Sequence, residues 1–574
     1  MWKQTIDPLG GLALSAAVAS LPIVFLFWAL AVKRMKGHWA ALGALAMAFV
    51  VAVAAFRMPA PLALLSSFHG ACFGIFPIGW IVFCAVMLHT IMERTGQFEA
   101  LKHSIATLTT DKRIQAVLVA FCFGALVEAC AGFGAPVAMS AGILAGLGIP
   151  LIEAAELCLV ANTAPVAFGA IGIPILMASN VSGIDQMAIS QMVGRQLPIL
   201  SLIVPFYVIG IMSGLKGIRE TWSTALIAGA SFAVTQWWSS NYLGPTLPDI
   251  LSALVSMAAV GIWLTTRKRG GGTRTEGATP HHSPLFAWSP FLIVCVLMII
   301  WALPDVKALL DMVTRKAPVL GLHNAIESAT TGKPIAAEYT INLLSAAGTA
   351  LFISCVVTAL SQGFSLHELW RTYVETLIKL KYPLITVGSL LAYAYLGNAS
   401  GMTVTLGTFI AGTGAMFALF APLLGWLGVF ITGSDTSSNA IFGKLQAVTA
   451  EKVGISPVLT VASNASGGVA GKMVSPQSIA VATAATGLTG QEATLFRRTV
   501  KHSLILVSIV MVLTYLQSNA LSWMVPEAAA THVSAKHGAN LGRAAIILAC
   551  GIVVSLAIAA AARNGERTSE SKHD

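Results

Sequence analysis

Three charged residues stand inside stretches that are otherwise apolar and rich in small residues. They are Glu128, Asp435 and Lys472. A charge at the centre of a membrane helix costs about 2.5–3.5 kcal/mol on insertion scales, so its retention calls for a role. Lys472 could neutralise a substrate carboxylate, whereas Glu128 and Asp435 could carry protons, because burial favours the neutral form of a carboxyl group. The alternative role for all three is an ion pair between helices.

Four uncharged polar residues accompany these charges, namely Asn162, Thr163, Asn464 and Ser466. Their amides and hydroxyls offer donors and acceptors suited to a ligand with one hydroxyl and one carboxylate. We therefore predict that these four residues and Lys472 bind substrate, and that Glu128 and Asp435 couple transport to protons. Histidine and cysteine residues show no metal spacing, so we predict no metal site, no structural disulfide and no cofactor.

The polar residues belong to a short repeat. Asn, Gly and Pro recur at the same spacing in two places, as Asn162, Gly169 and Pro174, and as Asn464, Gly471 and Pro476. A Gly-Ile step precedes each copy, and upstream of it lies a small-residue block with one acid, 128–134 in the first case and 433–439 in the second. The order of these features predicts an internal duplication.

The repeat has a physical meaning in a membrane. Secondary transporters often contain paired repeats whose interrupted helices meet near the bilayer midplane. Interrupted backbone survives at that depth only where protein or a water-filled cavity covers it, and the freed N–H groups at a half-helix start attract anions. For the glycine pairs Gly142/Gly146 and Gly210/Gly214, we predict close helix packing instead.

Composition requires a membrane protein. Of the 574 residues, 56% are apolar and only 10% are charged, with a mean hydropathy of +0.79, whereas soluble domains carry about 25% charged residues. The runs that are free of Asp, Glu, Lys and Arg include 11–32, 37–56, 70–92, 221–248, 502–526 and 544–562. Each is long enough for the roughly 20 residues that a crossing needs.

These patterns predict an all-α polytopic membrane protein. We expect roughly 12–14 membrane segments in two repeat-related halves, with discontinuous helices or re-entrant hairpins. The predicted units are a first transmembrane half (1–264), a cytoplasmic linker (265–286), a second transmembrane half (287–526) and a C-terminal extension with an extra span (527–574).

The net charge of +10 reflects topology rather than nucleic-acid binding. The basic residues lie between spans and form no stripe with interleaved aromatic residues. Clustering of Lys and Arg in cytoplasmic loops predicts an outside N-terminus and an inside C-terminus. Apart from the substrate and protons, membrane lipid is the expected partner.

Enzymatic motifs are absent from the sequence. The segment 466–473 resembles a phosphate-binding loop but lacks its first glycine and its closing Ser or Thr, and neither HExxH nor GxSxG occurs. The sequence therefore favours neither ATP-driven transport nor catalysis.

Several of these blocks together resemble the L-lactate permease family. The similar segments are 115–136, 162–169, 194–198, 425–430, 433–439 and 467–477. The resemblance runs from near residue 1 to about residue 526 and implies a symporter of the bacterial cytoplasmic (inner) membrane. Such proteins carry L-lactate, and often D-lactate and glycolate, with protons. The family is usually grouped with transporters that have re-entrant hairpins and elevator-like movement.

Other functions stay open on the sequence alone. One lysine with amide donors fits a 2-hydroxymonocarboxylate better than a dianion, yet a permease for gluconate or a dicarboxylate, with sodium as the alternative coupling ion, is compatible with the same residues. A passive anion channel is a third reading, and an intramembrane enzyme a fourth. His69, His89 and His502 lie in predicted spans and are further proton-carrying candidates.

Overall fold

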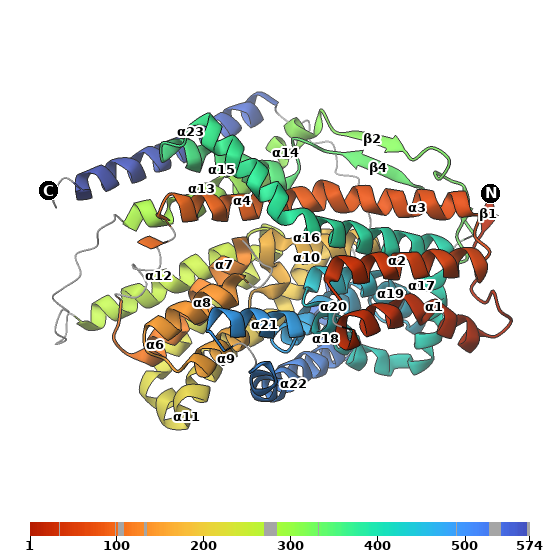
Figure 1. Cartoon of the computed structure of the whole chain (residues 1–574), viewed down its shortest axis with the longest axis horizontal. Coiled ribbons are helices and arrows are strands. Elements are labelled where there is room, and N and C mark those ends of the chain that lie inside the picture. The colour runs from red at the N-terminus through yellow and green to blue at the C-terminus, as the bar shows by residue number, and fades with distance from the viewer. Residues whose placement is uncertain are drawn as a thin grey trace.

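The structure, a computed structural model, describes residues 1–33, 35–97, 99–100, 108–130, 135–268, 284–330, 332–488, 491–526 and 541–570. Most of the predicted linker (269–283) and parts of the predicted C-terminal extension (527–540 and 571–574) lie outside the described residues. The same is true of 131–134, the glycine-containing end of the Glu128 block. Figure 1 shows the helices and the two small groups of strands.

The chain is an all-α polytopic membrane protein in its transmembrane part. Among the described residues, nine helices are long and apolar enough to cross a membrane, and eleven if each of two bent helix pairs counts as one span. The first part comprises α1 (Leu12–Phe27), η1 (Trp28–Val32), α2 (Gly37–Ala54), α3 (Ala60–Phe73), η2 (Gly74–Gly79), α4 (Trp80–Arg94), α6 (Lys112–Ala116), η3 (Val117–Phe123), α7 (Gly124–Cys130), α8 (Ala135–Gly146), α9 (Leu151–Ala161), η4 (Val166–Phe168), α10 (Gly169–Ser182), α11 (Gln186–Tyr242) and α12 (Pro248–Lys268).

The second part has a similar mixture of long and short helices. It comprises α13 (Pro284–Ala302), α14 (Pro304–Asp311), α15 (Ala347–Ser361), α16 (Leu366–Ser400), α17 (Met402–Ile410), η5 (Ala411–Met416), α18 (Phe417–Thr432), α19 (Asp435–Val453), α20 (Pro457–Lys472), α21 (Pro476–Ala485), α22 (Glu492–Gln517), η6 (Ser522–Met524) and α23 (Leu541–Glu570). Helix α23 contains an apolar candidate span, Gly542–Arg563.

Helix α11 explains part of the difference between the nine candidate spans and the 12–14 membrane segments predicted from the sequence. Its 57 residues would extend about 85 Å if straight, yet the backbone leaves the helical region at Gly214, where φ is 61°. The two arms fold back on each other, because Ser201 Oγ donates to Gln236 Oε1 (2.7 Å) and Ser190 Oγ donates to the Ser240 carbonyl (2.9 Å). One candidate span therefore contains an antiparallel pair of crossings.

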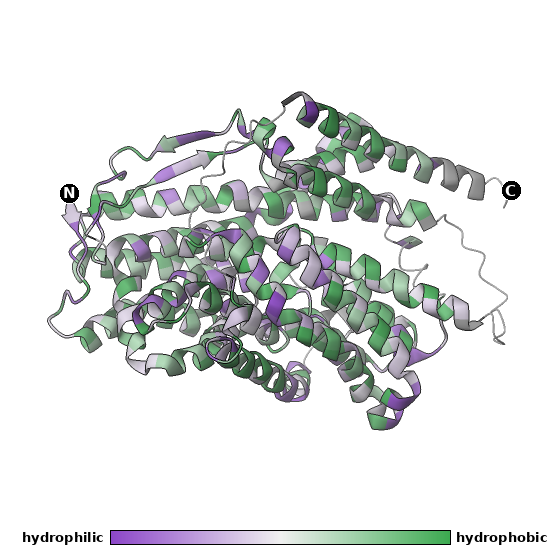
Figure 2. Cartoon of the chain, turned by 180° about the vertical axis from the view of Figure 1, so that it is seen from behind, coloured by the Kyte–Doolittle hydropathy of each residue, from purple (hydrophilic) through white to green (hydrophobic). Residues whose placement is uncertain are grey.

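Four short strands depart from the all-α expectation. Strand β1 (Trp2–Lys3) pairs in parallel with β3 (Ile326–Glu327), and β2 (Arg315–Pro318) pairs antiparallel with β4 (Glu338–Ile341). Figure 2 shows hydrophilic residues on β2 and β4 and apolar residues along most helices. The β1–β3 pairing brings the N-terminus, which the sequence predicts to lie outside, to the 304–341 connection.

The two repeat copies occupy comparable interrupted helices. Helices α9 and α10 meet at a 65° bend around residues 162–168. Helices α20 and α21 are likewise separated by residues 473–475. Helix α10 packs against α19, and α21 packs against α8, so each half inserts its second short helix against the other half. This reciprocal packing is what a duplication would produce, although the duplication itself stays a prediction.

Close packing through glycines occurs at other positions than the sequence predicted. Among the described residues, a Cβ atom on Gly142 or Gly146 would meet no atom within 4 Å, so the prediction for this pair was wrong. In the second pair, Gly214 forms the hairpin turn, and a Cβ atom on Gly210 would lie 3.3 Å from the Ile218 side chain of the returning arm. Backbone meets backbone instead between α18 and α20. There, a Cβ atom would overlap a main-chain carbonyl of the facing helix at each of three glycines, Gly425, Gly467 and Gly471.

Candidate functional site

A buried ion pair joins the two halves of the protein at the interrupted helices. Lys472 is the last residue of α20, Glu128 lies on α7, and Lys472 Nζ is 2.5 Å from Glu128 Oε1. The two residues are only 6% and 3% exposed. Each charge neutralises the other, which is the condition under which ionised groups persist away from water.

Asn162 completes the bonding of the Glu128 carboxylate. Its amide nitrogen Nδ2 donates to Glu128 Oε2 at 3.2 Å, so that each oxygen of Glu128 has its own donor. The other amide atom, Asn162 Oδ1, is buried and has no hydrogen-bond partner among the described residues. Asn162 therefore presents an unused acceptor directly beside the ion pair.

The backbone next to Asn162 is held in a rare conformation. Ala170, Ile171 and Gly172 have φ values of 44°, 59° and 73° at the start of α10. A left-handed conformation is unusual for any residue with a side chain and is a genuine outlier for a β-branched residue such as Ile171. Strain of this kind, of about 1–3 kcal/mol per residue, is found at ligand sites and moving segments.

Asp435 approaches the same pair from the second half. It is the first residue of α19 and is buried, and Gly468 lies so close that a Cβ atom there would overlap Asp435 Oδ1. Gly468 is one helical turn before Lys472 on α20, which puts Asp435 beside the lysine, and Asp435 interacts electrostatically with both Lys472 and Glu128. Its Oδ2 accepts from Asn439 Nδ2 at 3.4 Å, while Oδ1 has no partner among the described residues.

The remaining predicted ligands differ in whether their polar atoms are already hydrogen-bonded within the protein. The Thr163 hydroxyl donates to the Val160 carbonyl of its own helix (2.6 Å). The side chain of Asn464 is fully engaged between α19 and α20, donating to Asn439 Oδ1 (2.8 Å) and accepting from Gln446 Nε2 (3.1 Å). Ser466 Oγ, in contrast, is buried without a partner among the described residues.

Sequence reasoning missed one acid of this centre. Asp249 is the second residue of α12, is 1% exposed, and interacts electrostatically with Glu128 and Lys472. It directly follows the charge-free run 221–248, and therefore does not stand out in the sequence as a charge inside an apolar segment. The signal that could have found it is the Pro-Asp start of the next helix, because proline favours the first position of a helix and acids the first turn.

A second ionisable cluster, also missed, lies on the other side of α9. Arg498 Nη1 donates to Glu156 Oε2 at 2.8 Å, and His502 Nε2 is 3.4 Å from Glu156 Oε1. Tyr207 OH is 2.7 Å from His502 Nδ1. Two of the candidate histidines have ionisable neighbours, His502 in this cluster and His89, whose Nδ1 lies 3.6 Å from Glu93 Oε2. His69 instead packs edge-on against Tyr395.

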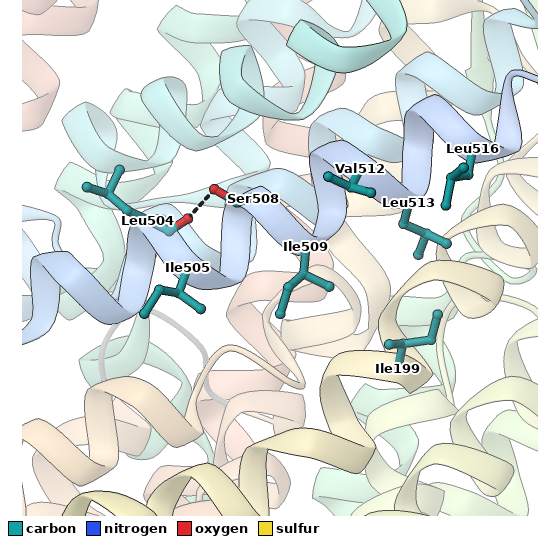
Figure 3. Close-up of a pocket in the computed structure, with 8 residues that line it drawn as sticks. All are labelled: Ile199, Leu504, Ile505, Ser508, Ile509, Val512, Leu513 and Leu516. Atoms are coloured by element: carbon teal, nitrogen blue, oxygen red, sulfur yellow. Dashed lines mark hydrogen bonds between the residues drawn. The ribbon is translucent and has the colours of Figure 1, made fainter.

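One groove on the molecule is lined by none of the residues of the polar centre. It has a volume of about 700 Å³ and runs along α22, where Ile505, Val512 and Leu516 face it together with Ile199 of α11 (Figure 3). Its one hydroxyl, Ser508 Oγ, donates to the Leu504 carbonyl of the same helix (2.7 Å). Such a surface suits lipid chains and offers nothing to an anion.

Comparisons with known proteins agree with one another. The family model described as L-lactate permease matches residues 15–521. The chain is 49% identical to the L-lactate permease of Bacillus subtilis (strain 168), a match that covers 92% of this chain and 100% of that protein. It is 46% identical to the glycolate permease GlcA of Escherichia coli (strain K12), over 91% of this chain and 99% of that protein. It is 45% identical to the L-lactate permease of the same strain, over 92% and 100%.

Proposed function

This chain belongs to the L-lactate permease family and is a multi-pass protein of the bacterial inner membrane, and from that premise we propose that it imports L-lactate together with protons. D-lactate and glycolate are proposed as further substrates, since a relative at 46% identity is a glycolate permease. The observation that carries the coupling proposal is the buried pair of Lys472 and Glu128 at the meeting point of the two halves.

The pair supplies a coupling mechanism by exchange of partners. A lactate carboxylate that reaches Lys472 competes with Glu128 for the ammonium group. Glu128 then loses its cationic partner while it stays buried, and an uncompensated buried carboxylate is strongly unfavourable. It therefore takes up a proton, so that binding of one anion favours binding of one proton. Release of lactate restores the ion pair and expels the proton.

The substrate hydroxyl has acceptors and donors at hand. Among the described residues, Asn162 Oδ1, which adjoins the ion pair, is a buried acceptor without a partner, and Ser466 Oγ is a buried hydroxyl without one. A 2-hydroxy acid places its hydroxyl one carbon from the carboxylate, so one Lys and one nearby amide suit it. Thr163 and Asn464, which we predicted as ligands, are proposed to position the site without contacting the substrate, because both side chains are already hydrogen-bonded within the protein.

Asp435 is proposed as a second proton-carrying group. One of its oxygens is unpartnered, and the single donor that reaches the other is an amide at 3.4 Å. In so apolar a place the neutral acid is the stable form when Lys472 is engaged elsewhere. Movement of α19 or entry of water would release that proton.

The test is uptake of labelled L-lactate into proteoliposomes that contain the purified protein. With an acidic outside, we expect lactate to accumulate above its external concentration, the lumen to acidify, and glycolate to compete. Sodium-driven accumulation that resists a protonophore would replace the proton with sodium. Equilibration without accumulation under any gradient would point to a channel.

A further inference from the structure

We propose that Asp249 is a proton-binding residue that exchanges protons with Glu128 during transport; this inference rests on the proposed proton-coupled function. Neither carboxylate oxygen of Asp249 has a hydrogen bond of good geometry among the described residues, where the amide of Gln236 is the donor that acts on it, and the side chain is 1% exposed. An ionised carboxylate with so little donor support is among the least stable groups that a protein interior can hold. In this conformation Asp249 therefore carries a proton.

The charges around Asp249 leave it no cation of its own. Helix α12 packs against α7 and α11 (Figure 1), and the groups that act on Asp249 are Glu128 from α7, Lys472 from α20 and the amide of Gln236 from α11. Lys472 is already engaged with Glu128. Asp435 acts on the same pair, so that three carboxyl groups surround one lysine. The lysine can balance the charge of only one ionised carboxylate.

Asp249 is also connected to the strained segment beside the site. Gln236 Nε2 donates to the Ala164 carbonyl (3.1 Å), and the Pro245 carbonyl fills the space that a side chain on Gly172 would need. The turn before α12 thus lies on the interrupted segment that carries Asn162. A change in that segment on substrate binding changes the surroundings of Asp249 directly.

A row of hydroxyls leads away from Asp249 along α12. Ser252 and Ser256 follow it at three and seven residues, and therefore share its helix face. Ser252 Oγ is buried without a partner among the described residues, and Ser256 Oγ donates to the Ala228 carbonyl (2.9 Å) beside Cys122. Buried unpartnered hydroxyls are where ordered water is held, and water between them can pass protons.

These contacts define a balanced step. When substrate takes Lys472, the O–H bond of Asp249 breaks and an O–H bond forms on Glu128, after which a hydronium proton from bulk water, passed along water beside Ser252, reprotonates Asp249. On substrate release Asp249 first gives its proton to water, and the O–H bond of Glu128 then breaks as an O–H bond forms again on Asp249, because Glu128 regains Lys472. Asp249 is thus a proton donor and acceptor for Glu128 and makes no contact with substrate.

The test compares wild type, Asp249→Asn and the control Asp311→Asn in proteoliposomes with an internal pH dye. The control removes an aspartate carboxylate whose partner is Thr314, in the connection after α14. For Asp249→Asn we expect proton-driven lactate accumulation and luminal acidification to fall at least about tenfold, the scale on which positioned proton transfer acts. Exchange of external for internal lactate at equal pH should persist, because it needs no net proton release.

Three results would overturn the assignment. They are wild-type accumulation by Asp249→Asn, loss of exchange together with accumulation in a folded variant, and infrared spectra in which Asp249→Asn removes no protonated-carboxyl band. If the Asn variant does not fold, Asp249→Glu should accumulate lactate with a displaced pH profile, and an unchanged profile would count against the proposal. Absence of luminal acidification in wild type would instead reject the proposed function itself.

Discussion

Glu128 and Asp435, the acids that precede the two repeat copies, differ in the hydrogen-bond donors that they receive. Glu128 receives a donor on each oxygen, one from the Lys472 ammonium at 2.5 Å and one from the Asn162 amide at 3.2 Å. Asp435 receives a single amide donor, at 3.4 Å, and its other oxygen has no partner among the described residues. Such surroundings stabilise an ionised carboxylate in the first half and a neutral acid in the second.

The difference shows how similar helix breaks can divide one task. The first half contributes the acid from α7, and its helix break adds an amide and three residues of left-handed backbone. The second-half break contributes the cation at the end of α20. Neither half contains both members of the ion pair. In the proposed mechanism, the coupled binding of an anion and a proton therefore requires both halves.

Replacing the cation should have the largest effect. Lys472→Met keeps length and apolar packing but removes the charge, and we expect L-lactate affinity to fall by roughly 100-fold, the loss of a charged hydrogen bond worth up to about 3 kcal/mol. Binding to detergent-purified protein measures it. The matched control is Lys444→Met, whose ammonium donates to the Ser182 carbonyl at 3.0 Å and should affect folding stability only. Unaltered affinity in Lys472→Met would reduce the lysine to a structural partner of Glu128.

The two acids should respond differently to isosteric amides. Glu128→Gln leaves Lys472 without a counter-charge, so we expect both accumulation and stability to suffer, the latter by about 3–5 kcal/mol. Asp435→Asn replaces a neutral acid with a neutral amide, so we expect normal stability, retained lactate exchange and lost proton-driven accumulation. Thermal unfolding and uptake at several pH values distinguish the two. If both variants accumulate lactate with the wild-type pH dependence, neither acid carries the proton and His502 becomes the next candidate.

Alanine substitutions at Gly468, Gly169 and Gly142 should destabilise the protein most where a methyl group has the least space. Gly468→Ala drives a methyl group into the short Asp435 side chain, and we expect about 1–3 kcal/mol of destabilisation. In Gly169→Ala the new atom would lie 2.7 Å from Glu128 Oε1, at the end of a longer side chain that can shift, so the loss should be smaller. Gly142→Ala meets nothing within 4 Å and should be neutral or slightly stabilising. Equal unfolding temperatures for all three would contradict this ranking.

The smallest effect on transport is expected at Thr163. Thr163→Val removes a hydroxyl that already bonds its own helix, so we expect about 1 kcal/mol less stability and a KM for lactate within about twofold of wild type. Its neighbour provides the contrast, because Asn162→Ala removes both a donor to Glu128 and the free acceptor, and should raise KM by roughly tenfold. A larger KM change in Thr163→Val than in Asn162→Ala would mean that the threonine turns toward the substrate.

Sequence patterns predicted the membrane class and the residues of the ion pair, and the reason is energetic. A charge inside an apolar, glycine-rich segment has few stable solutions, so Glu128 and Lys472 stood out separately. Their pairing did not follow from the sequence, because it depends on how α7 and α20 pack. Asp249 was missed because a charge at the start of a helix looks like an ordinary helix-capping acid until burial is known.

The glycine spacing was less informative than the charges. The pair Gly142 and Gly146 satisfies the small-residue pattern of membrane helix packing, yet a Cβ atom at either position would meet none of the described atoms within 4 Å, whereas Gly467 and Gly471, which have the same spacing, meet the backbone of α18. Small residues permit a close approach, and only the path of the neighbouring helix decides whether it occurs. The same limit applied to the 57-residue helix α11, whose hairpin depends on one glycine at position 214.

The ion pair also has a consequence for biosynthesis. Glu128 and Lys472 are separated by 344 positions, so the ribosome completes α7 long before α20 emerges. During that interval the nascent N-terminal half enters the bilayer with an acid that lacks its cation, at a cost of about 2.5–3.5 kcal/mol for a charge at the helix centre unless the acid takes a proton. A truncated product ending before α20 would keep this defect permanently. Membrane quality-control proteases that recognise polar residues in lipid would then have a mark by which to distinguish incomplete chains from finished ones.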